Sequence, residues 1–98
     1  MAKTKKYFIR TNKNELKEKE GQQVDENAFI YKGKERNHWI ISDAKSGLYI
    51  CSGDTKKETI AMYQSEDMQE KVKRAYKNPI YKTRVKEFKQ LIKDLAKA

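Results

Sequence analysis

The sequence predicts an α+β fold, an antiparallel meander of three to four strands covered on one face by two C-terminal helices. Two observations predict it. Up to residue 53, β-branched and aromatic residues cluster in short stretches between turn formers, which is typical of strands. After Gly53, apolar residues recur about every 3.6 positions, which is typical of amphipathic helices. A chain of 98 residues is too short for two cores, so we expect one domain over residues 1–98.

Four segments are predicted to be strands, namely residues 7–11, 28–32, 38–43 and 48–52. Between the last two, Gly47 can adopt the positive φ of a type I turn followed by a bulge, which indicates a tight hairpin. Residues 32–37 would close a second hairpin. Residues 12–27 are polar and mix acids with bases, and we expect a mobile loop or a short helix there.

Helix signals begin directly after the last strand. Thr55 and Glu58 have the spacing of a capping box, and Ser65, followed by two acids, offers a second N-cap at which the helix could restart. Pro79 ends this helix, because proline disfavours helical backbone in the preceding residue and has no N–H to donate. The final helix carries an apolar stripe at spacings of four and three, formed by Tyr81, Val85, Phe88, Ile92 and Leu95. We interpret this stripe as the contribution of the helix to the core.

Positive charge is concentrated at the C-terminal end. Residues 71–98 hold ten Lys or Arg side chains against two acids, Glu87 and Asp94, in a chain of formal net charge +9. Four lysines repeat the spacing of the apolar stripe one position further on, namely Lys82, Lys86, Lys89 and Lys93. None of them has an acid three or four residues away, and like charges at that spacing cost about 0.2–0.5 kcal/mol per pair in an isolated helix. An uncompensated row of this kind is typical of a surface that binds phosphates.

Further basic side chains would flank the row, namely Arg84, Lys73, Arg74 and Lys77. The last three extend it if the two helices pack as an antiparallel pair across Pro79. The competing interpretation is an ordinary solvated face, or one that acids from residues 14–26 neutralise in the fold.

Aromatic residues of the strands suggest a second candidate surface. If one sheet face, carrying Phe8, Ile30, Ile40, Leu48 and Ile50, packs against the helices, alternation places a set of rings on the opposite face. These rings are Tyr7, Phe29, Tyr31, Trp39 and Tyr49. On an open sheet they could stack on unpaired bases, but both sides of every strand carry apolar residues, so some rings are equally explained as core.

Catalytic signals are weak. His38 and Cys51 are the only residues of their types, and the sequence has no metal-ligand spacing, no Gly-rich phosphate loop and no nucleophile motif. We therefore expect a protein that is not an enzyme and that needs no cofactor or metal. A single cysteine fits a reducing compartment. No apolar run approaches a membrane span and the first residues lack the apolar stretch of a secretory signal, so we expect a cytoplasmic protein without a membrane partner.

The sequence thus favours a small basic accessory protein that docks on nucleic acid mainly through phosphate contacts from its C-terminal helices. The sequence pattern fits DNA and RNA equally well, and it fits duplexes and single strands equally well. The alternative is a protein-binding adaptor or inhibitor, of a kind plausible in mobile genetic elements, whose basic helix engages an acidic protein surface or the nucleic-acid groove of another protein. A homodimer through the last helix or the sheet fits either hypothesis.

Overall fold

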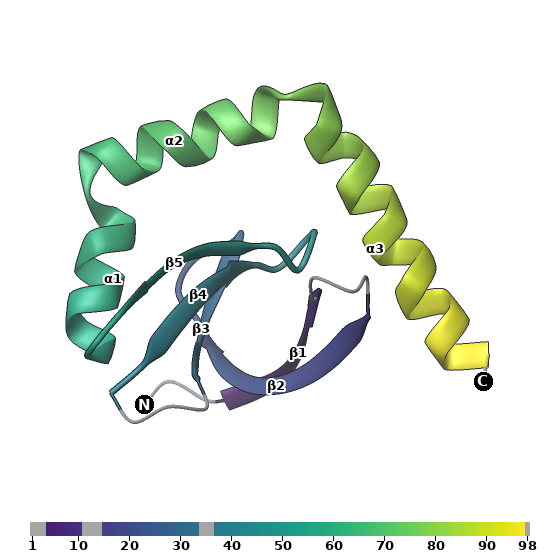
Figure 1. The fold of residues 1–98 in the computed structure, drawn as a ribbon, viewed down its shortest axis with the longest axis horizontal. Helices are drawn as coiled ribbons and strands as arrows, with labels where there is room; N and C mark the ends of the chain where they lie inside the picture. Colours follow the sequence, from purple (N-terminus) through teal and green to yellow (C-terminus); the bar gives the residue numbers. More distant parts are fainter. Residues whose placement is uncertain (1–3, 11–14, 34–36, 98) are drawn as a thin grey trace.

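The computed structural model describes residues 4–10, 15–33 and 37–97. Within these ranges the chain forms a five-stranded antiparallel sheet in the order β1-β2-β3-β4-β5, followed by three helices. The elements are β1 (Thr4–Arg10), β2 (Leu16–Gln23), β3 (Ala28–Lys32), β4 (Trp39–Asp43), β5 (Tyr49–Gly53), α1 (Lys56–Gln64), α2 (Glu66–Lys77) and α3 (Pro79–Lys97). The predicted α+β meander with helices at its C-terminal end is confirmed, but it has one strand and one helix more than expected (Figure 1).

The additional strand is β2, which occupies the middle half of the segment 12–27, for which a loop or short helix was predicted. Residues 12–14 lie outside the described residues. β2 pairs with β1 along its length, from Thr4 opposite Gln22 to Arg10 opposite Leu16, so backbone pairing holds a strand with few apolar side chains. One of its acids forms an ion pair across the two strands, since Glu18 lies 3.5 Å from the Lys6 ammonium. Hydrophobic alternation, the usual sign of a strand, is therefore weak here.

The additional helix arises because the break at Ser65 is real. Ser65 has extended backbone angles, and its hydroxyl accepts a hydrogen bond from the backbone of Met68 at 3.4 Å. The predicted cap at the start of α1 is also present, since the Thr55 hydroxyl accepts from the Glu58 N–H at 3.0 Å. Each helix that begins before Asn78 therefore has a hydroxyl cap on its first turn.

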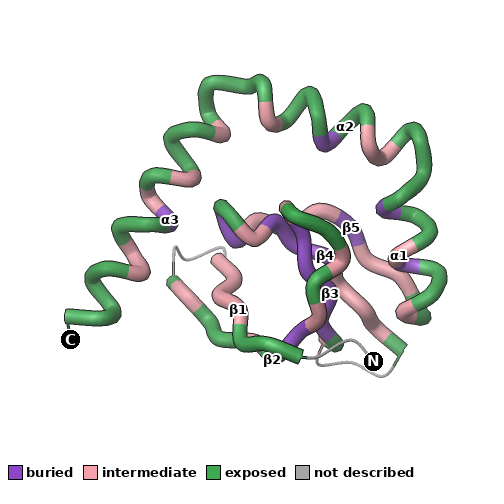
Figure 2. The backbone as a smooth tube through the Cα atoms, turned by 180° about the vertical axis from the view of Figure 1, so that it is seen from behind, coloured by how far each residue is buried: buried purple, intermediate pink, exposed green. Residues whose placement is uncertain are grey.

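The helices cover one face of the sheet, and the main core lies between them. Buried side chains of β3, β4 and β5 meet Tyr63 of α1 and Val72 of α2 in this layer. Buried positions of the backbone are accordingly concentrated in the sheet (Figure 2). The sheet contributes Ala28, Ile30, Ile41 and Cys51. α1 packs across β4 and β5, and α2 continues over the same face (Figure 1).

The opposite sheet face forms a second buried layer, which is aromatic. Phe29 is fully buried, and the Tyr7 ring stacks on it with centroids 4.1 Å apart and an interplanar angle of 4°. Tyr31 lies beside Phe29 at 5.8 Å. Gly21 of β2 lies directly beneath these rings, because a Cβ there would come within 2.6 Å of the Ile30 carbonyl and 3.3 Å of the Phe29 ring. The curled sheet of Figure 1 thus buries side chains on both faces.

The predicted division of residues between the faces is wrong for β4. Trp39 lies opposite Lys32, two residues from the pair Ile30–Ile41, so it shares the helix-facing side and packs against the main core. Ile40 lies opposite Tyr31, on the aromatic side. Because both faces of β4 are apolar, only the pairing register distinguishes them.

The two long helices do not form the antiparallel pair considered above. α2 and α3 meet at a corner around Asn78, and α3 then runs away from α2, so that the three helices form an arch over the sheet (Figure 1). The rings of Tyr76 and Tyr81 pack at this corner with centroids 4.8 Å apart. The residue before Pro79 is extended, with ψ 129°, which gives the chain its turn.

Candidate functional site

Four exposed lysines of α3 form the candidate surface, called here the lysine row: Lys82, Lys86, Lys89 and Lys93. At 1.5 Å per residue the row extends for about 16 Å along the helix. Within the described ranges, none of these ammonium groups forms an ion pair. Acids of β2 that could have neutralised the row face β1 instead, since Glu18 binds Lys6 and Glu20 accepts from the Thr4 hydroxyl at 2.7 Å.

Phe88 determines which side of α3 faces solvent. This ring is 4% exposed and lies against Gly47, where a Cβ would come within 2.5 Å of the ring. Gly47 has φ +71° in the turn between β4 and β5, and its carbonyl accepts a hydrogen bond from Arg10 N at 3.0 Å. With 3.6 residues per turn, the four lysines lie roughly 100° to 160° around the helix from Phe88. Docking through Phe88 therefore turns the lysine row outwards.

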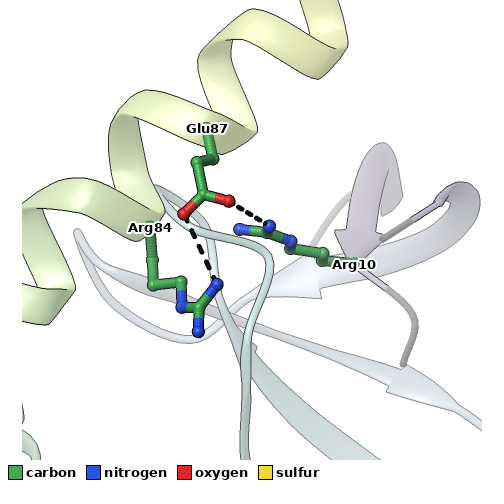
Figure 3. Close-up of polar contacts among 3 residues, drawn as sticks. All are labelled: Arg10, Arg84 and Glu87. Carbon is green, nitrogen blue, oxygen red and sulfur yellow. Dashed lines mark hydrogen bonds and ion pairs between the residues drawn. The ribbon is translucent and has the colours of Figure 1, made fainter. Parts of the chain in front are cut away.

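An ion-pair cluster fixes the same helix to β1 (Figure 3). The guanidinium of Arg10, whose side chain is 4% exposed, lies 2.7 Å from a Glu87 carboxylate oxygen, and Arg84 lies 3.4 Å from the other oxygen. The hydrogen bond from Arg10 holds the pKa of Glu87 below its ordinary value. One of the two acids in this basic segment is thus neutralised by arginines and does not offset the lysines. No sequence pattern indicated the contact, because 77 residues separate Arg10 from Glu87.

A buried aspartate fixes the α2–α3 corner. Asp43, at the end of β4, is 3% exposed and accepts hydrogen bonds from the hydroxyls of Tyr76 at 3.1 Å and Tyr81 at 2.7 Å. It also accepts from the backbone N–H and the hydroxyl of Ser46. Burial, together with the aspartate, raises the pKa of both tyrosines well above the ordinary value. Tyr81 was predicted as part of an apolar stripe, and the structure shows that its hydroxyl is hydrogen-bonded while its ring packs against Tyr76.

A second tyrosine–aspartate contact holds α1. The Tyr63 hydroxyl donates to Asp25 at 2.7 Å, and the other carboxylate oxygen of Asp25 accepts from the backbone of Asn27 and Ala28. Desolvation and the neighbouring carboxylate raise the pKa of Tyr63. Each of the three helices therefore carries one tyrosine that donates to an aspartate of the sheet region. These contacts determine where α3, and hence the lysine row, stands relative to the sheet.

The flanking basic residues are exposed but are not all brought to the lysine row. Arg84 is engaged with Glu87, and Arg74 lies 3.7 Å from Glu70 within α2. Because α2 and α3 diverge at the corner (Figure 1), Lys73 and Arg74 do not lie alongside the row. Lys77 ends α2 beside the corner. The basic surface is thus one straight row on α3, with further charges around a bend.

The aromatic residues do not form an open platform. Phe29 and Tyr31 are 0% and 6% exposed, and Tyr7 is stacked on Phe29. Trp39 is half-buried on the helix-facing side, with the Lys56 ammonium 5.9 Å from its ring centroid. Tyr49 alone among the five rings is largely exposed, at 63%.

Cys51 and His38, the two residues considered for catalysis, are packed against other parts of the fold. Cys51 is 3% exposed in the main core, and burial raises the pKa of its thiol. His38 packs against Gly33, to which its carbonyl is hydrogen-bonded at 2.7 Å. Over residues 4–10, 15–33 and 37–97, no cluster of three or more His, Cys, Asp and Glu side chains is placed to hold a metal ion. In the same ranges no helix has the length and apolar character needed to cross a bilayer.

Comparison with protein-family models, curated proteins and solved structures gave no match. Function is therefore inferred from the placement of the side chains.

Proposed function

We propose that the protein binds nucleic acid through phosphate contacts made by the lysine row. The observation that carries the proposal is an exposed row of four lysines without carboxylate partners among the described residues, on the free side of a helix that is docked through its other side. Like charges three and four residues apart disfavour the helix by about 0.2–0.5 kcal/mol per pair. A polyanion would relieve that repulsion, and each phosphate neutralised would release counterions and add affinity.

The experiment compares two fourfold Lys→Gln variants that lose the same number of charges. One changes Lys82, Lys86, Lys89 and Lys93, and the matched control changes four exposed lysines elsewhere, Lys5, Lys32, Lys45 and Lys57. Binding of labelled oligonucleotides is measured by fluorescence anisotropy at several salt concentrations. If the row contacts four phosphates, the slope of log K against log salt contains a contribution of about −3.6, which the first variant loses. Equal loss in both variants would contradict a local site and indicate attraction by net charge alone.

Thermal unfolding of the first variant provides the folding control. Because three lysine pairs at three- and four-residue spacing are removed, we expect a melting temperature that is unchanged or slightly raised. A lowered melting temperature would show that the lysines support the fold and would remove the basis for a binding role.

An adaptor that engages an acidic protein surface is the second candidate. It is favoured by exposed apolar side chains at the two ends of α3, where Ile80 and Leu95 are 61% and 52% exposed. Such a protein would bind one partner at a fixed ratio, with affinity that depends on these two residues. Light scattering with the Leu95→Gln variant tests the related proposal of a homodimer through α3, because that change would then yield monomers.

A further inference from the structure

We propose that the nucleic acid bound by the lysine row is double-stranded and is contacted through its backbone, without stacking on its bases. This inference rests on the proposed function and adds the class of ligand. Three features of the structure carry it: the burial of the aromatic rings, the position of the ring that stays largely exposed, and the placement of the lysines along one helix and outside the hollows beside it.

Single-strand binders combine a basic groove with aromatic rings on which successive bases stack. In this protein the rings that could serve are used for folding. Phe29 and Tyr31 are buried, the Tyr7 ring is covered by Phe29 in a nearly parallel stack, and Trp39 packs against the main core. Opening this layer for a base would expose the interior of the sheet.

Tyr49 is the remaining exposed ring, and it lies away from the lysine row. It is paired with Ser42, which is in turn paired with Phe29, so Tyr49 belongs to the aromatic face of the sheet. Its hydroxyl is 2.9 Å from that of Ser52 in the same strand. The helices cover the opposite face (Figure 1). A nucleic-acid strand bound along the lysine row would therefore not reach the Tyr49 ring.

The hollows described beside α3 do not include the lysine row. Two hollows adjoin α3, of about 260 and 210 Å³, and neither is lined by a lysine of the row. The lysines lie instead roughly 100° to 160° around α3 from Phe88, the ring that docks the helix against Gly47. A flexible single strand would have to become ordered along α3 without a hollow beside the lysines to hold its bases.

A duplex is already ordered before it binds, so it would not need to become ordered on α3. It carries one charge per roughly 1.7 Å of its axis, so the length of the row, about 16 Å, corresponds to about nine or ten phosphates over both strands. α3 carries the four lysines along one straight helix, and a duplex presents phosphates that are already ordered before binding. Duplex DNA and duplex RNA share this chemistry and differ in groove shape.

The test uses one sequence of about 20 base pairs, roughly two helical turns, as duplex DNA, as duplex RNA and as each single strand. Anisotropy is measured with the full-length protein and with Tyr49→Ala. We expect at least one duplex to bind about tenfold or more tighter than every single strand at equal salt, and Tyr49→Ala to change affinity less than twofold.

Single strands that bind as tightly as both duplexes, or a large loss in Tyr49→Ala, would overturn the duplex inference while leaving the proposed function in place, provided that the lysine-row variant still loses binding. Absence of binding to every oligonucleotide at low salt would overturn both.

Discussion

Gly47 is the residue at which three parts of the chain meet. It has positive φ in the β4–β5 turn, its carbonyl accepts from β1, and its hydrogen atoms face Phe88 of α3. Two separate physical demands therefore select glycine: a backbone conformation that disfavours a Cβ, and a ring placed where that Cβ would be.

Gly47→Ala tests both demands. The positive φ alone costs about 1 kcal/mol or more for alanine, and the contact of 2.5 Å with the Phe88 ring adds to it. Urea unfolding of Gly47→Ala, Phe88→Ala and the double variant separates the two, because the alanine at position 47 should cost less once the ring is gone. Strict additivity would contradict the proposed clash.

Glu87 supplies the second prediction for single residues. Its pKa is lowered by Arg10, so its contribution to stability is present above the pKa of the unfolded state and is lost as pH falls through the lower pKa of the folded state. We expect Glu87→Gln to be less stable than the wild type at neutral pH, and the difference to shrink as the pH is lowered below about 4.

Asp94→Asn is the matched control for Glu87→Gln. It removes the other acid of α3, which accepts a hydrogen bond from Gln90 at 2.9 Å within the same helix. Urea midpoints are compared for the three proteins across acidic and neutral pH. Equal behaviour of the two variants would show that net charge, and not the Arg10 contact, governs the effect.

Among the elements, the three helices share one means of attachment. Tyr63, Tyr76 and Tyr81 each donate a hydroxyl hydrogen to Asp25 or Asp43. An ionised tyrosine cannot donate and would face a carboxylate in a partly buried site, which is why the pKa of all three is raised. The helices are thus attached by contacts that require neutral phenol groups.

This attachment predicts loss of stability at alkaline pH. Below the pKa of an unfolded tyrosine, about 10, both states are protonated and the contribution is fully present. Above it the unfolded state releases protons that the folded state retains, so the free energy of unfolding falls as pH rises. Urea midpoints measured from about pH 8 to pH 11 should show this fall, with a smaller slope in Tyr81→Phe than in the control Tyr49→Phe. A flat profile through this range would contradict it.

The molecule as a whole depends on a sheet that curls far enough to bury side chains on both faces. Gly21 permits the curl, since its missing side chain leaves room for the Ile30 carbonyl and the Phe29 ring. The end of β1 then reaches the β4–β5 turn, where Arg10 N binds the Gly47 carbonyl. The same turn receives Phe88, so closure of the sheet and docking of α3 occur at one place.

Gly21→Ala should disturb this closure. Its Cβ would meet a backbone oxygen at 2.6 Å, which no rotamer change relieves, so we expect a loss of roughly 1–3 kcal/mol. The near-ultraviolet circular dichroism of the Tyr7–Phe29 layer should weaken together with the urea midpoint. The comparison is Gly33→Ala, whose Cβ would meet the side chain of His38, and a smaller cost in Gly21→Ala than in Gly33→Ala would contradict the interpretation.

Local signals were sufficient for much of this architecture. The caps at Thr55 and Ser65, the break before Pro79 and the positive φ of Gly47 depend on neighbours within a few residues, and all are present. The burial of Phe88 is confirmed as well. The lysine row is also a local pattern, because a helix places residues three and four apart on one side.

Contacts between distant parts of the chain needed the folded structure. β2 is held by pairing with β1 and not by apolar alternation, the faces of β4 depend on register, and the contacts of Arg10 with Glu87 and of Asp43 with the tyrosines join residues far apart in sequence. Sequence periodicity describes one element at a time, whereas these features depend on which elements become neighbours. The direction in which the lysines face and the burial of the aromatic rings follow from that arrangement.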